Sequence, residues 1–124
     1  MAQNKLEQFG PVALTTTLTT NIISPAAAGA GATGYTATAT YIVLTHIRVL
    51  NKTGGAITLT LYKGATGANA AGTEFMGTAL SVAANSYVDW YGRLRLEGTN
   101  GFIVGGASAN TSLTFHAEGE VGLV

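Results

Sequence analysis

The sequence predicts an all-β fold, a single-domain antiparallel β-sandwich of the jelly-roll type with about eight short strands. Apolar residues recur with a period of two rather than 3.6, as in strands that bury one face. Turn-forming residues separate these runs at nearly regular intervals. Every window long enough for an amphipathic helix is interrupted by glycine or crowded with threonine, whose branched side chain favours strands.

The first segment, residues 1–11, is expected to be an N-terminal arm, and the sandwich domain is expected to cover residues 12–124. Leu6 and Phe9 are isolated large apolar residues at a spacing that fits no strand of the domain, and Gly10-Pro11 separates them from the first strand. Such an arm can place both apolar side chains in a groove of a neighbouring subunit. A disordered tail is the alternative.

The strands that follow are expected wherever apolar and polar residues alternate or β-branched and aromatic residues gather. The predicted strands are 12–23, 40–50, 57–62, 80–83, 87–91, 93–97, 102–104 and 112–121. Leu113, Phe115 and Ala117 alternate with polar residues most clearly. The run 40–50 is apolar at both parities at its start, so that part is expected to be covered on both faces.

Turns and loops are expected between these strands. Residues 51–55 contain Asn, Thr and two Gly, and they are predicted to close a hairpin between the strands 40–50 and 57–62. Asn100-Gly101 is typical of a two-residue hairpin turn. Two stretches rich in Gly and Ala, 26–34 and 64–72, are predicted to be loops.

Composition excludes several classes of function. The chain has 124 residues with 6 Lys plus Arg, 6 Asp plus Glu and no Cys. Without net charge there is no field to attract nucleic acid, and without cysteine there is neither a disulfide framework nor a thiol nucleophile. No stretch approaches the roughly 18 apolar residues of a membrane helix, and the first ten residues lack the apolar core of a secretory signal. We therefore expect neither nucleic acid nor a membrane as a partner.

No motif predicts catalysis, a cofactor or a metal ion. Gly29, Gly31 and Gly34 match the spacing of a dinucleotide-binding loop but lack the strand before it and the helix after it. His116, Glu118 and Glu120 share one strand face, which is read as a solvated face rather than a metal site because no cysteine or second nearby histidine completes a ligand set. The stretch 106–110 lacks the final glycine of a nucleophile elbow. We therefore expect a protein that is not an enzyme.

Aromatic residues concentrate at one place, where Tyr87, Trp90 and Tyr91 surround Asp89. Aromatic rings beside a carboxylate suit a sugar-binding face, but large rings also fill cores and subunit interfaces. The candidate interface residues are Leu6, Phe9, Tyr87, Trp90 and Tyr91.

The run from Tyr41 to Val121 carries a family resemblance. Its features are the stretches 47–53 and 58–62, the pair Leu80 and Val82 before Asn85-Ser86-Tyr87, then 94–98 and 113–119. In these features the chain resembles small β-sandwich structural proteins of tailed-bacteriophage virions. The resemblance covers about two thirds of the chain.

The resemblance implies a non-enzymatic role in the virion, which is assembled in the host cytoplasm. The expected function is decoration or stabilisation of the capsid shell, through self-association as a dimer or trimer and through contacts with the major capsid protein. The alternative is a tail-associated or receptor-binding module that binds carbohydrate. Only 10% of the residues are charged, and a weakly charged, neutral surface promotes association.

Overall fold

The fold is all-β in the computed structural model, which describes residues 4–17, 21–23, 39–64, 73–97 and 101–123. The described residues form eight strands and no helix, which confirms the predicted fold class. The strands are β1 (Asn4–Ala13), β2 (Asn21–Ile23), β3 (Ala39–Asn51), β4 (Ile57–Lys63), β5 (Glu74–Val82), β6 (Tyr87–Leu96), β7 (Ile103–Ala107) and β8 (Leu113–Leu123). The predicted loop 26–34, most of 64–72 and Asn100 lie outside the described residues.

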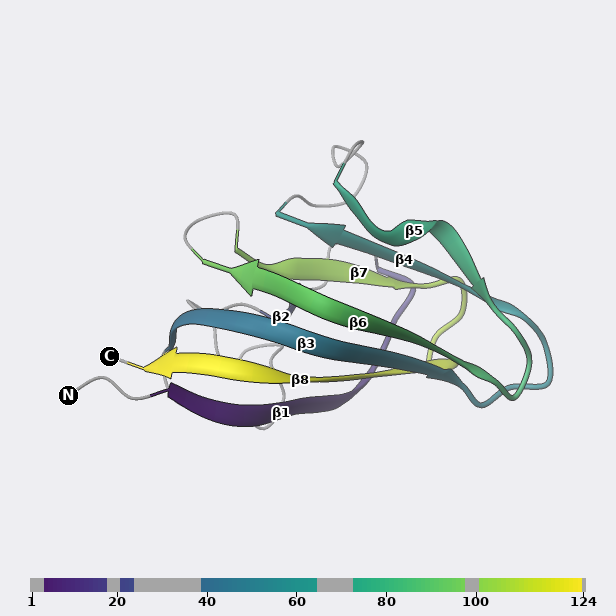
Figure 1. Ribbon diagram of the computed structural model, residues 1–124. Coiled ribbons are helices and arrows are strands. Elements are labelled where there is room, and N and C mark those ends of the chain that lie inside the picture. Colours follow the sequence, from purple (N-terminus) through teal and green to yellow (C-terminus); the bar gives the residue numbers. More distant parts are fainter. Residues whose placement is uncertain (1–3, 18–20, 24–38, 65–72, 98–100, 124) are drawn as a thin grey trace.

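The strands form two packed antiparallel sheets, in the orders β1-β8-β3-β6 and β2-β7-β4-β5 (Figure 1). The first strand pairs with the eighth, the second with the seventh, the third with the sixth and the fourth with the fifth. These are the pairings of one long hairpin rolled up on itself, and β3 with β8 and β4 with β7 then complete the sheets. The topology is therefore that of a jelly roll.

The core lies between the two sheets and receives side chains from both. Its largest fully buried side chains are Phe9, Phe115, Leu14, Ile22, Ile23, Ile42, Leu44, Ile47, Leu59, Leu61, Leu96 and Ile103. Because successive side chains of a strand point to opposite faces, the residues between these positions face outward. The alternation seen in the sequence of β4 and β8 is this division between core and solvent.

A bulge in β3 explains why its apolar residues change parity. Ile42 and Leu44 point into the core, and so do Ile47 and Val49, although they lie at the other parity. The pairing of β3 with β8 shifts by one residue between Leu44 and His46, which reverses the alternation there. Val43 is buried as well, so the start of this strand is covered on both faces as predicted.

Two predicted hairpins are wrong. The turn after Asn51 leads from β3 in one sheet to β4 in the other, and the connection that contains Gly101 likewise leads from β6 to β7 in the opposite sheet. Of the chain neighbours among the described strands, only β4 and β5 pair with each other. Turn residues such as Asn and Gly permit a sharp reversal, but they do not decide whether the chain returns within its sheet or crosses to the facing one.

The predicted N-terminal arm is also wrong. Residues 4–13 form β1, which pairs with β8 at the edge of the sandwich, with Asn4 opposite Gly122. Leu6 and Phe9 point to opposite faces of this strand, because residues three apart in a strand do not share a face. Gly10 has a φ of 94° and lies with Pro11 at a register shift within β1. An edge strand tolerates such a bulge and a missing N–H, so the strand continues past it.

The largest differences between predicted and observed strand boundaries lie at three places. The run 12–23 contains the end of β1 and all of β2, and β5 begins at Glu74 rather than at Leu80. The two predicted strands 87–91 and 93–97 are one continuous strand, β6.

Candidate interaction surface

The solvent-facing side of the β1-β8-β3-β6 sheet carries most of the polar and aromatic side chains singled out in the sequence. We call its central part the outer face. The strand register arranges the outer face in three rows: Gln8, Glu118, His46 and Tyr91; His116, Arg48 and Asp89; Ala13, Thr114, Leu50 and Tyr87. Each row draws on strands that are distant in sequence, so this surface exists only in the folded chain.

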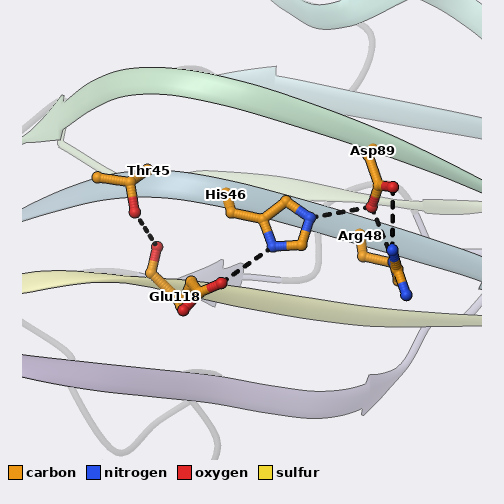
Figure 2. Close-up of polar contacts among 5 residues, drawn as sticks. All are labelled: Thr45, His46, Arg48, Asp89 and Glu118. Carbon is orange, nitrogen blue, oxygen red and sulfur yellow. Dashed lines mark hydrogen bonds and ion pairs between the residues drawn. The ribbon is translucent and has the colours of Figure 1, made fainter.

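His46 lies between two carboxylates on neighbouring strands (Figure 2). Its Nε2 is 2.9 Å from Oδ1 of Asp89 on β6, and its Nδ1 is 3.2 Å from Oε1 of Glu118 on β8. Only the imidazolium form can donate a hydrogen bond to both carboxylates, since a neutral imidazole has one N–H. His46 thus links β6, β3 and β8 across the sheet.

Arg48 also forms hydrogen bonds with the Asp89 carboxylate. Its Nε donates to Oδ1 at 2.8 Å and its Nη2 donates to Oδ2 at 3.1 Å, which is a bidentate pair. Hydrogen bonds from Arg48 and then from His46 lower the pKa of Asp89 from 3.8 to about 2. The hydrogen bond to Asp89 raises the pKa of Arg48 in turn. Asp89 is therefore ionised over the whole physiological range.

Two tyrosines cover this charged network and remain open to solvent. Tyr91 stacks on His46, with ring centroids 4.6 Å apart and an interplanar angle of 13°. The guanidinium carbon of Arg48 lies 4.2 Å from the centre of the Tyr87 ring, within cation–π distance. Tyr91 is 71% exposed and Tyr87 is 50% exposed. The two rings are large exposed groups whose positions are supported by neighbouring side chains.

An open hollow of about 750 Å³ lies along the outer face. Its lining includes Leu6, Gln8, Leu50, His46, Arg48, His116 and Glu118. Apolar side chains from β1 and β3 thus stand beside charged groups from β3 and β8. Such a mixed lining suits contact with another macromolecule, where apolar groups supply buried area and charged groups set the orientation.

The predicted interface residues divide into two groups. Leu6, Tyr87 and Tyr91 are exposed on the side of the sheet that faces solvent. Phe9 is 1% exposed and belongs to the core, so its prediction as an interface residue is wrong. Trp90 points inward and packs edge to face against Phe75 with centroids 5.1 Å apart, and its half-buried ring agrees with the core alternative.

The network on the outer face differs from a nucleophilic catalytic triad. Asp89 and His46 have the hydrogen bond of such a triad, but the second ring nitrogen of His46 faces the Glu118 carboxylate instead of a hydroxyl or thiol. Ser108, in the stretch compared with a nucleophile elbow, follows β7, and its Oγ accepts a hydrogen bond from the backbone N–H of Thr58. This serine therefore helps to hold β4 against the end of β7.

The two glutamates on the outward side of β8 have partners on β3. Glu118 contacts His46, and Glu120 accepts a hydrogen bond from Tyr41 Oη at 3.2 Å. Among the described residues, no group of three or more His, Asp or Glu side chains is arranged to hold a metal ion. The glycines of the dinucleotide-like pattern, Gly29, Gly31 and Gly34, lie outside the described residues.

Sequence reasoning missed the cross-strand network of His46, Arg48 and Asp89. Its signal is present in the sequence, because polar residues at 46 and 48 and at 87, 89 and 91 occupy alternate positions of two strands. Joining them required the antiparallel register of β3 and β6, which the turn between neighbouring strands does not supply because these two strands are not consecutive.

Comparison with protein-family models and with curated protein sequences finds no match to this chain. Within the part of the chain that the structure describes, no helix is long and apolar enough to span a membrane.

Proposed function

We propose that this chain is a non-enzymatic structural protein of a tailed-bacteriophage virion, and that it decorates or stabilises the capsid shell through self-association and contacts with the major capsid protein. The observation that carries the proposal is the outer face, where exposed Tyr87 and Tyr91 are supported by Arg48 and His46. Aromatic anchors of this kind bury a large area with little loss of side-chain entropy. The surface is thus suited to a lasting contact.

The balance of charge supports the same role. Six basic and six acidic residues give no net charge, and 10% of the residues are charged against about 25% in ordinary soluble domains. A neutral surface with few charges has little electrostatic repulsion between copies. This property favours a protein that occupies a fixed place in a crowded assembly.

The proposal is tested by adding the purified chain to phage heads that lack it and measuring co-sedimentation. The chain is expected to bind, and the double substitution Tyr87→Ser with Tyr91→Ser is expected to weaken binding at least tenfold. Tyr62→Ser is the matched control, because Tyr62 lies on β4 in the opposite sheet. Absence of binding by the unaltered chain, or equal loss for the double variant and the control, would contradict the proposal.

A second candidate function is carbohydrate binding, as in a tail-associated or receptor-binding module. The specific observation that favours it is that the exposed rings of Tyr87 and Tyr91 lie beside Asp89 and Arg48, next to the open hollow. Stacking rings and charged hydrogen-bonding groups together suit a sugar. Binding on a glycan array that Tyr91→Ala abolishes, without any binding to phage heads, would select this function over the first.

A further inference from the structure

The four strands at the edges of the two sheets differ in how open they are to further pairing. An exposed strand edge carries backbone N–H and C=O groups that can pair with another chain, and proteins usually interrupt such edges. β1 is interrupted by the bulge at Gly10-Pro11, β2 has three residues, and β5 has positive φ values at Met76 and Ala79. Three of the four edges thus carry features that oppose pairing with a second sheet.

β6 shares only one of these features: its pairing with β3 shifts by one residue between Tyr91 and Leu94. It has ten residues, none of them with a positive φ, and among the described residues it pairs with β3 alone. Its inward-facing residues stay at even positions along the whole strand, because Val88 is opposite Val49, Leu94 opposite Leu44 and Leu96 opposite Ile42. Its odd positions therefore face the same side as the outer face. β6 is therefore a long strand edge along which the alternation of side chains continues past the register shift.

The sequence of β6 is complementary to itself when it is read in the antiparallel direction about Tyr91. The opposed pairs would be Tyr91 with Tyr91, Trp90 with Gly92, Asp89 with Arg93, Val88 with Leu94, and Tyr87 with Arg95. Three of these pairs match aromatic with aromatic, acid with base, and apolar with apolar, which are favourable cross-strand pairs. In the other two, the Trp90 ring already lies over Gly92 of its own chain, and the Arg95 guanidinium already lies over its own Tyr41 ring, 4.5 Å from the ring centre.

We infer that β6 pairs with β6 of a second copy of this chain, antiparallel about a two-fold axis at Tyr91. Arg93 is exposed and forms no ion pair within the described part of the chain. Across this axis it faces Asp89 of the second copy, whose carboxylate is bonded to Arg48 and His46 and has one of its four lone-pair sites left for a further donor. The two-fold symmetry uses the Asp89–Arg93 pair twice. Charge complementarity thus selects a second copy of the chain as the occupant of this edge.

Neighbouring registers match less well. An axis at Asp89 sets this carboxylate opposite itself, and an axis at Arg93 sets two guanidinium groups opposite each other and Asp89 opposite Glu97. An axis at Gly92 sets glycine opposite glycine and assigns Asp89 to Arg95, whose Nε already donates to Glu97 at 2.7 Å. The axis at Tyr91 leaves that pair intact and provides a partner for Arg93.

The pairing of β6 with β6 specifies how the self-association in the proposed function takes place. Its role in the virion rests on that proposed function. It would join the two β1-β8-β3-β6 sheets into one continuous sheet and place the two outer faces side by side. Two linked faces bind a repetitive shell more tightly than one, because the second contact is intramolecular.

The pairing is tested with single-cysteine variants, since the chain contains no cysteine of its own. Directly opposed residues in antiparallel strands have Cα atoms about 4.5 to 5.5 Å apart, within the range of a disulfide. Tyr91→Cys is expected to form a disulfide-linked dimer under mild oxidation. Leu6→Cys is the matched control, because Leu6 is exposed on the other edge of the same sheet. This variant is expected to remain a monomer. Equal cross-linking of both variants, or none at residue 91, would overturn the inference.

Charge reversal tests the register. Arg93→Glu is expected to weaken dimerisation in sedimentation equilibrium at least tenfold, because the introduced carboxylate would face Asp89 of the second copy, with unchanged thermal unfolding of the chain. Arg95→Glu is expected to weaken it less, and a larger loss for Arg95→Glu than for Arg93→Glu would overturn the axis at Tyr91. Shell binding is measured separately on the same samples. A monomer that binds phage heads overturns the strand pairing alone, and a dimer that does not bind them overturns the proposed function alone.

Discussion

The buried amide of Asn51 holds together two connections between the sheets. Its Nδ2 lies 2.9 Å from the carbonyl oxygens of Gly55 and Val82 and 3.2 Å from that of Ala83, and its Oδ1 accepts hydrogen bonds from Thr53. Asn51 is fully buried. One side chain therefore satisfies backbone groups of the β3–β4 turn and of the end of β5.

Replacing Asn51 with alanine is expected to lower the free energy of unfolding by about 2 to 4 kcal/mol, because it removes the donor to the buried Val82 carbonyl and the other hydrogen bonds of this side chain. The measurement is urea unfolding followed by circular dichroism. Asn110→Ala is the control, since exposed Asn110 accepts one hydrogen bond from the Thr16 N–H and its loss is expected to lower stability by about 1 kcal/mol or less. A similar effect of the two substitutions would show that the Asn51 amide has no special role.

The carboxylate of Asp89 makes stability depend on pH at the acidic end. Its pKa is about 2 in the folded chain against 3.8 for the unpaired group, so the folded state favours the ionised form. The stabilisation is fully present above about pH 4 and is lost as the pH falls towards 2. The melting temperature of the unaltered chain is therefore expected to exceed that of Asp89→Asn most above pH 4, with the difference shrinking towards pH 2.

The measurement is thermal unfolding at a series of pH values between 2 and 5, with Glu97→Gln as the control. Hydrogen bonding to Arg95 also lowers the pKa of Glu97, but both side chains of that pair are about half exposed. An exposed pair contributes little to stability. A difference in melting temperature between the unaltered chain and Asp89→Asn that does not change with pH would contradict the stabilising role of the ionised Asp89 carboxylate.

Among the strands, β1 shows most clearly what separates a sheet edge from a tail. Phe9 is in the core, whereas Leu6 on the same strand is 86% exposed. Phe9→Ala is expected to lower the free energy of unfolding by about 3 to 5 kcal/mol, and Leu6→Ala to change it by no more than about 0.5 kcal/mol. Deleting residues 1–10 is expected to destabilise the domain as well, because it uncovers β8. Chemical denaturation of the three variants checks these expected changes in stability. Equal stability of Phe9→Ala and the unaltered chain would show that β1 contributes nothing to the core and behaves as a tail.

Strands were predictable from the sequence wherever their two faces meet different surroundings. Ile57, Leu59 and Leu61 in β4 and Leu113, Phe115 and Ala117 in β8 alternate because one face is buried and the other is not. In β3 the apolar residues move from even to odd positions because of a bulge. The bulge could not be recognised in the sequence, since apolar residues at both even and odd positions also fit a strand that is buried on both faces. The hairpin predictions failed because a jelly roll sends most consecutive strands to opposite sheets, and local turn chemistry does not encode that choice.

The candidate surface was predictable in part. Tyr87 and Tyr91 are conspicuous in the sequence as aromatic residues among polar ones, but Trp90 between them faces inward as strand alternation requires. The interface prediction for Phe9 depended on an arm, and β1 is instead a strand of the sheet. The contacts of His46 with Asp89 and Glu118 join positions 43 and 72 residues apart, and only the register of the folded sheet brings them together.

The whole molecule is built from contacts between distant parts of the chain. β1 pairs with β8 and β3 with β6, so the termini of the described chain lie side by side, and the outer face is assembled from strands β1, β8, β3 and β6 (Figure 1). β4 and β5 are the described chain neighbours that pair directly. Every other pairing requires a long loop to close before its contacts form, which slows folding.

Refolding is therefore expected to take milliseconds to seconds, as in other all-β sandwiches. The single tryptophan, Trp90, packs against Phe75 from the facing sheet and reports on the docking of the sheets in stopped-flow fluorescence. If the local β4–β5 pair forms first, Leu80→Ala in β5 slows folding, whereas Phe9→Ala in β1 mainly speeds unfolding. Refolding complete within about 100 microseconds would contradict the expected rate. Slower folding of Phe9→Ala than of Leu80→Ala would instead show that β1 pairs with β8 before the local β4–β5 hairpin forms.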